Sequence, residues 1–209
     1  MRRSSCESGF TLLEVVTAVS ITVLAFASIH FAAGTAVVGK LLAASAVANA
    51  QQGRQAVAWI ADRVRQAGFR TSNSAIGRCQ DRMPVEPGYL PTASALWINA
   101  DVDDEGAPET LGFRIETVAG VPAVTETVIP CEAGGRAIDQ PITSPTSVRA
   151  EALTFRYFDA AGAELTNPST SAEIRAIRLV TVSLDVEADA GPHGPAAQTW
   201  TAAIALRNP

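Results

Sequence analysis

The sequence predicts an α+β fold, in which one long N-terminal helix packs on an antiparallel β-sheet domain. The first part of the chain has one continuous apolar run that is followed by apolar residues at helical spacing. The part beyond residue 93 has apolar residues at alternate positions, and no helical pattern interrupts these segments. We therefore expect consecutive strands that pair antiparallel and place their apolar face on the helix.

The composition indicates a folded domain that does not bind nucleic acid. Of the 209 residues, 47% are hydrophobic and 18% are charged, which supplies a sizeable core. The formal net charge is −5, and Lys40 is the only lysine. Phosphate binding requires clustered basic side chains. We therefore expect no nucleic-acid partner.

An uncharged run extends from Val15 to Gly39. It is longer than the roughly 20 residues that a helix needs to cross a bilayer. Arg2 and Arg3 precede the run, and no small-residue cleavage site follows it, so we expect a retained anchor rather than a signal peptide. Because basic residues tend to stay cytoplasmic, the chain beyond about residue 40 is expected across the inner membrane.

An amphipathic pattern follows the uncharged run. Val57, Ile60 and Val64 recur at helical spacing and predict one apolar stripe. Gly68 is a suitable C-terminal stop for this helix. We therefore expect a single helix from residue 10 to about residue 67, whose stripe is covered by the sheet.

The remaining chain predicts a loop and then strands. Residues 70–93 are rich in Pro, Gly and Ser, which is typical of a loop. Gly162 is available for a hairpin turn. Six later segments have the alternating pattern of strands, namely 95–100, 110–116, 123–129, 152–158, 177–187 and 199–206.

The stretch G-FTLLEVV, with Gly9, Phe10 and Glu14, resembles the class III leader of type IV pilins and type II secretion pseudopilins. In that family a membrane prepilin peptidase cuts after the glycine and methylates the new N-terminal amine. The resemblance implies cleavage between Gly9 and Phe10, N-methylation of Phe10, and loss of the leader 1–9.

Two further stretches resemble PilW-type minor pilins. Residues 53–70 match the end of the long helix with its AGF turn, and residues 200–209 match the last strand with its LRN ending. J-type pseudopilins share the helix pattern. The resemblance implies the type IV pilin fold, with a leader at 1–9, a transmembrane assembly helix at 10–39, its amphipathic continuation at 40–68, and a globular β domain at 69–209.

The resemblance implies a minor pilin that is incorporated into a type IV pilus and helps to initiate its assembly within a tip or priming complex. The implied partners are other minor pilins, the major pilin, the prepilin peptidase and a large tip adhesin. The implied location is the inner membrane, as a single-pass protein, before assembly and the pilus surface afterwards. A minor pseudopilin of type II secretion is the alternative, and a pilin-anchored enzyme or ligand-binding domain is a third hypothesis. No nucleophile–base or nucleotide-binding motif appears, so we expect no enzyme activity.

Glu14 is a carboxylate at the head of the uncharged run. The resemblance assigns it a role in subunit assembly, as the partner of a neighbouring subunit's N-terminal ammonium. A cation within about 4–6 Å favours the ionised carboxylate in an apolar environment. The alternative is that Glu14 only reaches the lipid headgroups near the end of the helix.

Cys79 and Cys131 form one even pair, because Cys6 lies in the leader. The expected compartment is oxidising, which favours a disulfide between them. Two cysteines by themselves do not make a structural zinc site. The alternative is a pair of buried thiols that do not meet.

The segment 101–109 is strongly acidic. Asp101, Asp103 and Glu105 precede Gly106 in the order of the first half of a calcium loop, but Gly112 stands where the bidentate glutamate is required. The pattern favours a solvated acidic turn, with weak calcium binding as the alternative. No other metal or cofactor is expected.

Overall fold

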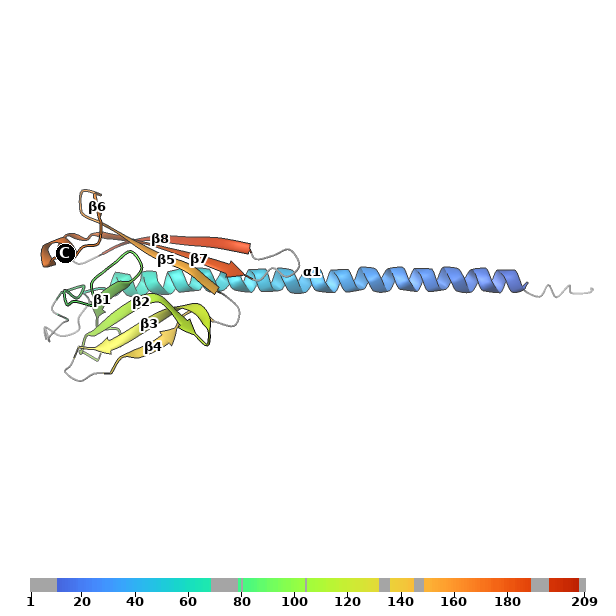
Figure 1. The fold of residues 1–209 in the computed structure, drawn as a ribbon, viewed down its shortest axis with the longest axis horizontal. Helices are drawn as coiled ribbons and strands as arrows, with labels where there is room; N and C mark the ends of the chain where they lie inside the picture. The colour runs from blue at the N-terminus through green and yellow to red at the C-terminus, as the bar shows by residue number, and fades with distance from the viewer. Residues whose placement is uncertain are drawn as a thin grey trace, which may run out of the picture. The chain divides into compact units, whose positions relative to one another are not determined.

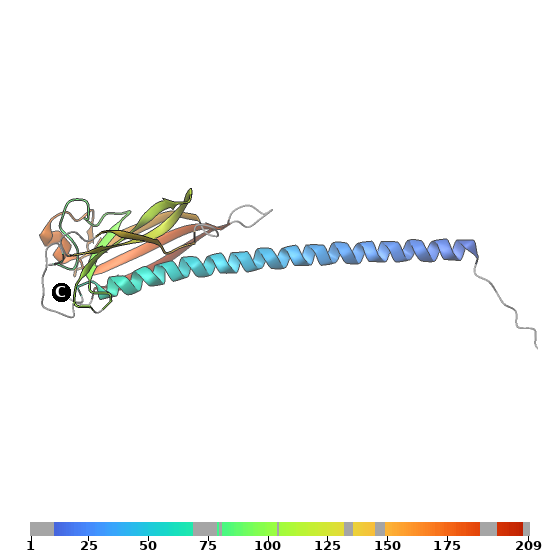
Figure 2. The ribbon, with the colours of Figure 1, turned by 90° about the horizontal axis from the view of Figure 1, so that it is seen from below.

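The computed structural model has a mixed α+β fold, with one long N-terminal helix followed by antiparallel sheets (Figures 1 and 2). It describes residues 11–68, 79, 81–103, 105–131, 136–144, 149–188 and 196–206, without the side chains of residues 45, 46, 49 and 196. Gly9 and Phe10 therefore lie outside the described residues. The chain divides into two compact units, Met1–Ala44 and Ser45–Pro209, and the boundary falls within the helix.

The helix α1 spans Leu12–Gln66, close to the predicted bounds. It ends where Gly68 takes a φ of 80°, a left-handed conformation that favours glycine. The amide of Gly68 donates to the backbone oxygen of Asn99 at 2.8 Å. The end of the helix is therefore attached to the first strand of the sheet domain.

The first sheet has the strand order β1-β2-β3-β4, with every pair antiparallel. Its strands are β1 (Leu96–Ala100), β2 (Glu109–Val118), β3 (Val121–Pro130) and β4 (Ile138–Pro141). A two-residue turn joins β2 to β3, and both of its residues, Ala119 and Gly120, have positive φ angles of 53° and 84°. Such turns match the right-handed twist of the strands, so this hairpin is locally specified.

The second sheet has the order β6-β5-β7-β8 and is also antiparallel. Its strands are β5 (Arg149–Phe158), β6 (Glu164–Leu165), β7 (Leu179–Ala188) and β8 (Ala196–Ala205). A short helix, α2 (Ser171–Ala176), precedes β7 and begins with a capping box between Thr170 and Glu173. The prediction of a single sheet missed this division, and it also missed β4, β6 and α2. These elements have only four, two and six residues, which is too short for a periodic pattern.

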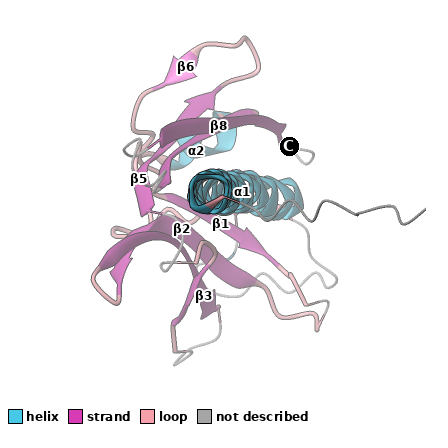
Figure 3. Ribbon diagram, turned by 90° about the vertical axis from the view of Figure 1, so that its right-hand side faces the viewer, coloured by secondary structure: helices cyan, strands magenta, loops and turns pink. Residues whose placement is uncertain are grey.

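The core of the unit Ser45–Pro209 lies around the second half of α1, which has a sheet on each side (Figure 3). The predicted stripe is buried at Val57, Ile60 and Val64. The same hydrophobic cluster includes Phe113 from the first sheet and Phe155 from the second. The helical stripe is thus covered by two sheets rather than one.

Two glycines allow tryptophan rings to lie against the backbone. A Cβ atom at Gly53 of α1 would stand 2.6 Å from Cδ1 of Trp200 on β8. A Cβ atom at Gly112 of β2 would overlap the ring of Trp97 on β1. Both approaches are possible only for glycine, because neither ring position leaves room for a side chain.

Candidate functional site

The first half of α1 presents an exposed apolar surface. Every residue from Leu12 to Leu41 is exposed. The segment Leu12–Ala44 is long and apolar enough to cross a membrane, judged by its length and composition. Both a membrane anchor and a signal sequence have these properties.

The hydroxyl groups of this segment are satisfied within the helix. Each serine or threonine between Leu12 and Ala44 donates to a backbone carbonyl three or four residues earlier. The five residues are Thr17, Ser20, Thr22, Ser28 and Thr35. A polar group that has no partner in hydrocarbon is costly. The helix can therefore enter an apolar environment without leaving these groups unpaired.

Glu14 is the only carboxylate in the segment Leu12–Ala44. Its Oε2 accepts hydrogen bonds from the backbone N–H of Thr11 at 2.9 Å and from the Thr11 hydroxyl at 3.0 Å. The amide of Glu14 in turn donates to Thr11 Oγ1 at 3.3 Å. This reciprocal pattern is that of a capping box, so Glu14 stabilises the start of α1. Its second oxygen, Oε1, has no hydrogen bond to any residue that the structure describes.

The structure joins Cys79 and Cys131 by a disulfide, as predicted, with the two Cα atoms 6.0 Å apart and a sequence separation of 52. Both cysteines are buried. The bond connects the segment that follows α1 to the end of β3. It therefore ties two segments together that lie 52 residues apart in the sequence.

Asn99 of β1 lies beside this disulfide and organises its surroundings. Its side-chain N–H donates to the Asp81 backbone oxygen at 2.8 Å, and its backbone N–H donates to the Arg82 oxygen at 2.7 Å. Its side-chain oxygen accepts a hydrogen bond from the Thr110 hydroxyl at 2.8 Å. Together with the bond from Gly68, these contacts join the helix end, the loop and two strands at one buried residue. Sequence reasoning did not find Asn99, because its partners lie far apart along the chain.

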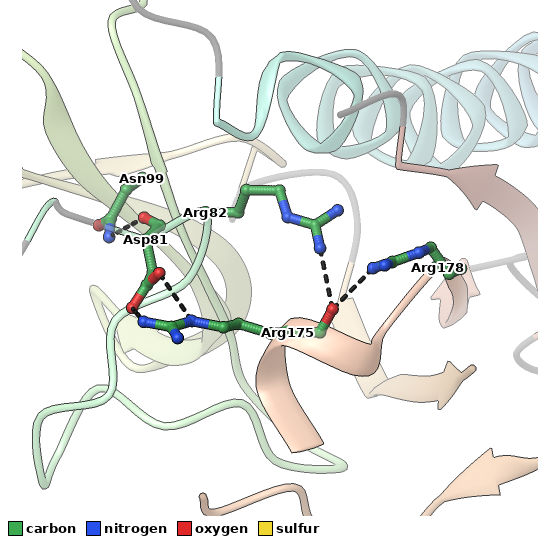
Figure 4. Close-up of polar contacts among 5 residues, drawn as sticks. All are labelled: Asp81, Arg82, Asn99, Arg175 and Arg178. Carbon is green, nitrogen blue, oxygen red and sulfur yellow. Dashed lines mark hydrogen bonds and ion pairs between the residues drawn. The ribbon is translucent and has the colours of Figure 1, made fainter. Parts of the chain in front are cut away.

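Charged side chains connect the same loop to α2 (Figure 4). The guanidinium of Arg175 donates to both oxygens of Asp81 at 3.1 Å. Arg82 and Arg178 both donate to the Arg175 backbone oxygen, at 3.1 and 2.6 Å. Burial, and then the charge of Arg178, lower the pKa of Arg82. The network is a polar connection between two parts of the unit Ser45–Pro209.

The acidic turn brings together a different set of carboxylates from the predicted one. Oxygen atoms of Asp101, Asp103 and Glu109 lie within 4.8 Å of one another, and Glu105 is not part of this group. Glu109 was missed because it belongs to β2, where the strand register places it opposite Ala100. Burial is the main cause that raises the pKa of Glu109, and the charges of Asp103 and Asp101 add to it.

Backbone N–H groups already bind all three carboxylates. Val102 donates to Glu109 at 3.2 Å, and Gly106 donates to Asp101 at 3.1 Å. The amide of Glu105 donates to Asp103 at 3.1 Å. These bonds explain the turn without an ion. The oxygen ligands are of the type that calcium prefers, but their geometry alone does not identify a metal site.

We call the unit Ser45–Pro209 the head. At its surface, the side chain of Trp59 on α1 contacts two charged residues. It is 44% exposed, and its indole N–H donates to Glu126 of β3 at 3.1 Å. The guanidinium of Arg63 lies 4.6 Å from the centre of the Trp59 ring and 3.5 Å from Oε1 of Glu126. Glu126 is only 4% exposed, so the cation and the indole together stabilise a buried carboxylate.

Comparisons of the chain with protein-family models, with curated proteins and with solved structures find no match.

Proposed function

We propose that this protein is a minor pilin, which is incorporated into a type IV pilus and helps to initiate its assembly as part of a tip or priming complex. One observation carries the proposal. The segment Leu12–Ala44 is long and apolar enough to cross a membrane, is exposed from Leu12 to Leu41, and carries one carboxylate, Glu14, in the first helical turn. A helix of this kind needs lipid around it before assembly and the helices of other subunits afterwards.

The geometry of Glu14 supports a pairing role in this assembly. One of its oxygens is used by Thr11, whereas Oε1 has no partner among the described residues. A carboxylate that enters an apolar bundle is costly unless a cation neutralises it. The N-terminal ammonium of a neighbouring subunit, which would be exposed by cleavage after Gly9, is the cation we propose.

The proposed partners follow from this role. The prepilin peptidase processes the chain in the inner membrane, other minor pilins and the major pilin pack on its helix, and a large adhesin joins the complex at the tip. The disulfide between Cys79 and Cys131 supports an oxidising compartment for the head.

The experiment that tests the proposal combines gene deletion with complementation. Deletion should abolish or strongly reduce surface pili, counted by electron microscopy, and the wild-type gene should restore them. Normal pilus numbers in the deletion strain would contradict the proposal. If pili are normal and protein secretion is lost, the related role of a type II secretion pseudopilin replaces it.

Two variants separate the pairing role of Glu14 from its capping role. Glu14→Gln keeps a side chain that can cap the helix but removes the charge, so we expect loss of pili. Thr11→Ala removes the hydroxyl of the capping box, leaves the backbone N–H that donates to Oε2, and keeps the charge of Glu14, so we expect pili to remain. The opposite result, in which the Glu14→Gln variant forms pili and the Thr11→Ala variant does not, would show that Glu14 acts only as a cap.

Processing is a separate measurement on the same strains. Mass spectrometry of the membrane fraction should find a mature chain that begins at Phe10 and carries an N-methyl group. An intact Met1 terminus in cells that contain the peptidase would contradict the predicted cleavage.

A further inference from the structure

The strand β8 is an open edge of the second sheet. It is ten residues long and pairs with β7 along its whole length, whereas its other side has no partner strand among the described residues (Figure 1). Within the part of the chain that the structure describes, no residue makes a backbone hydrogen bond to that outer side. An edge of this kind presents a row of peptide groups that can pair with another chain.

The register identifies which groups face outward. The amide of Leu206 donates to the backbone oxygen of Arg178, and this pair continues the register between β7 and β8. Because bonded and outward-facing residues alternate in an antiparallel strand, the even-numbered residues of β8 bond to β7. The outward N–H and C=O groups therefore belong to the odd-numbered residues, namely Ala197, Thr199, Thr201, Ala203 and Ala205.

The other edges of the two sheets are short or protected. The edge strands β1 and β6 have only five and two residues. The edge strand β4 has four residues, which include Asp139 and Pro141. Charges, prolines and short lengths are the usual means by which proteins prevent edge-to-edge pairing. β8 is the longest of these edges and contains neither a charge nor a proline.

The odd-numbered residues of β8 have few side-chain polar groups, and the hydroxyl groups among them are hydrogen-bonded within the sheet. The Thr199 hydroxyl donates to Asp185 at 2.6 Å, and the Thr201 and Ser183 hydroxyl oxygens lie 3.2 Å apart in a hydrogen bond. The remaining outward-facing residues are alanines. Since the hydroxyl groups of Thr199 and Thr201 are already bonded within the sheet, covering this edge does not leave these two hydroxyl groups unpaired.

We propose that β8 is a docking edge, to which another subunit of the same assembly adds an extended strand with uncharged side chains. The occupant is a strand because only a polypeptide backbone offers donors and acceptors at the spacing of this row. Its side chains are uncharged because β8 offers no charge to pair with them. The small alanines and threonines leave room for larger β-branched residues opposite them. The inference rests on the proposed function, since it needs an assembly of several subunits.

Proline substitutions distinguish the N–H groups of β8 that point away from β7 from those that bond to β7. Ala203→Pro removes one outward N–H and leaves every bond to β7, so we expect the full-length protein to keep its melting temperature but to lose incorporation into pili. Ala203→Val is the matched control, because it keeps the N–H and suits a strand. Ala202→Pro removes an amide that bonds to β7, so it should lower the melting temperature and thereby test the assignment of the two rows.

Cross-linking in cells tests the partner directly. A photoreactive amino acid at position 203 should form an adduct that maps to a strand of another pilus subunit. The same group at Thr181, which lies opposite Ala203 but on the central strand, should not form it. Hydrogen exchange of the odd-numbered amides of β8 should slow by about tenfold or more in the assembled state, because pairing protects them.

The outcomes separate the two proposals. If the wild-type chain is found in pili but Ala203→Pro is incorporated normally and the outer amides stay unprotected, the docking edge is wrong and the pilin function stands. An adduct from position 181 in place of position 203 would show that the partner covers the sheet face and would also overturn the docking edge. If deletion of the gene affects neither pili nor secretion, both proposals fail.

Discussion

The two halves of α1 differ in a way that hydrophobicity alone does not explain. The segment Leu12–Ala44 is the more apolar half, yet its side chains are exposed from Leu12 to Leu41. The later stretch contains Gln55, Asp62 and Arg63, yet its stripe is buried beneath two sheets. What decides burial is the presence of a complementary surface on the same chain. The first half has no such surface among the described residues, and it is long and apolar enough to cross a membrane.

The first way to test this contrast is to remove the disulfide, for which we expect the largest effect. Replacing Cys79 and Cys131 by serine should destabilise the head by about 4 kcal/mol, because closing a loop of this length restricts the unfolded chain. For a unit of this size the melting temperature should fall by roughly 10 °C, measured by calorimetry of the detergent-solubilised full-length protein. Cys6→Ser should have no effect. An unchanged melting temperature in the double variant, or upon addition of reductant, would mean that the bond does not stabilise the head.

A pair of glycines on the same helix gives the most direct comparison of its halves. Gly53→Ala should destabilise the head by about 1–3 kcal/mol, because the new methyl group meets the Trp200 ring at 2.6 Å. Gly39→Ala is the matched control, since nothing lies within 4 Å of its Cβ position. Alanine is the better helix former, so this control should be neutral or stabilising by up to about 1 kcal/mol. Equal effects of the two substitutions on urea unfolding would contradict the packing of Trp200 on α1.

The next prediction concerns how much Arg63 on the second half of α1 stabilises the buried carboxylate of Glu126. Arg63→Met should cost about 1–3 kcal/mol, because among the described side chains Glu126 then keeps only the bond from Trp59. Adding Glu126→Gln to Arg63→Met should restore part of this loss, since the unpaired charge is gone. Arg65→Met, on the exposed side of the same helix, should change stability by less than about 0.5 kcal/mol. Urea unfolding of the wild type, of Arg63→Met, of Glu126→Gln and of the double variant measures the coupling energy between Arg63 and Glu126. Additive effects of the two substitutions would contradict this coupling.

The smallest expected effect is a pH dependence at Glu109. Burial raises its pKa in the folded protein, so the folded state binds more protons than the unfolded state between the ordinary and the raised pKa. The free energy of unfolding should therefore decrease as the pH rises through this window. Glu109→Gln should abolish that dependence and stabilise the head at neutral pH, by less than about 1 kcal/mol. If added calcium instead raises the melting temperature of the wild type and not of this variant, the acidic turn is a cation site.

Local patterns in the sequence were sufficient for much of the fold. The spacing of Val57, Ile60 and Val64 predicted the buried stripe, and the position of Gly68 predicted the end of α1. All six predicted strands exist, with bounds that differ by a few residues. The helix α2 had a readable signal that the prediction overlooked, namely Thr170 followed three residues later by Glu173.

Several features of the candidate sites depended on contacts that no local pattern contains. The register of β1 with β2 brings Glu109 to Asp101, and the turn of the chain brings Asn99 to the disulfide. Sequence alone paired Cys79 with Cys131 because only these two cysteines remained outside the expected leader and their compartment was expected to be oxidising. It could not show which strand would form an open edge, because that depends on the order of strands in space.

The sequence by itself determined a long helix with an apolar first half, a run of antiparallel strands, and Glu14 as the one acid of the apolar segment. These features follow from composition and from periods of two and 3.6 residues, which act over a few neighbouring positions. Only the tertiary structure decided that the strands form two sheets, that Trp200 rests on Gly53, and that β8 lies at an edge. The physical reason is that strand pairing and packing join residues far apart in the chain, and their free energy depends on every surface that competes for the same partner.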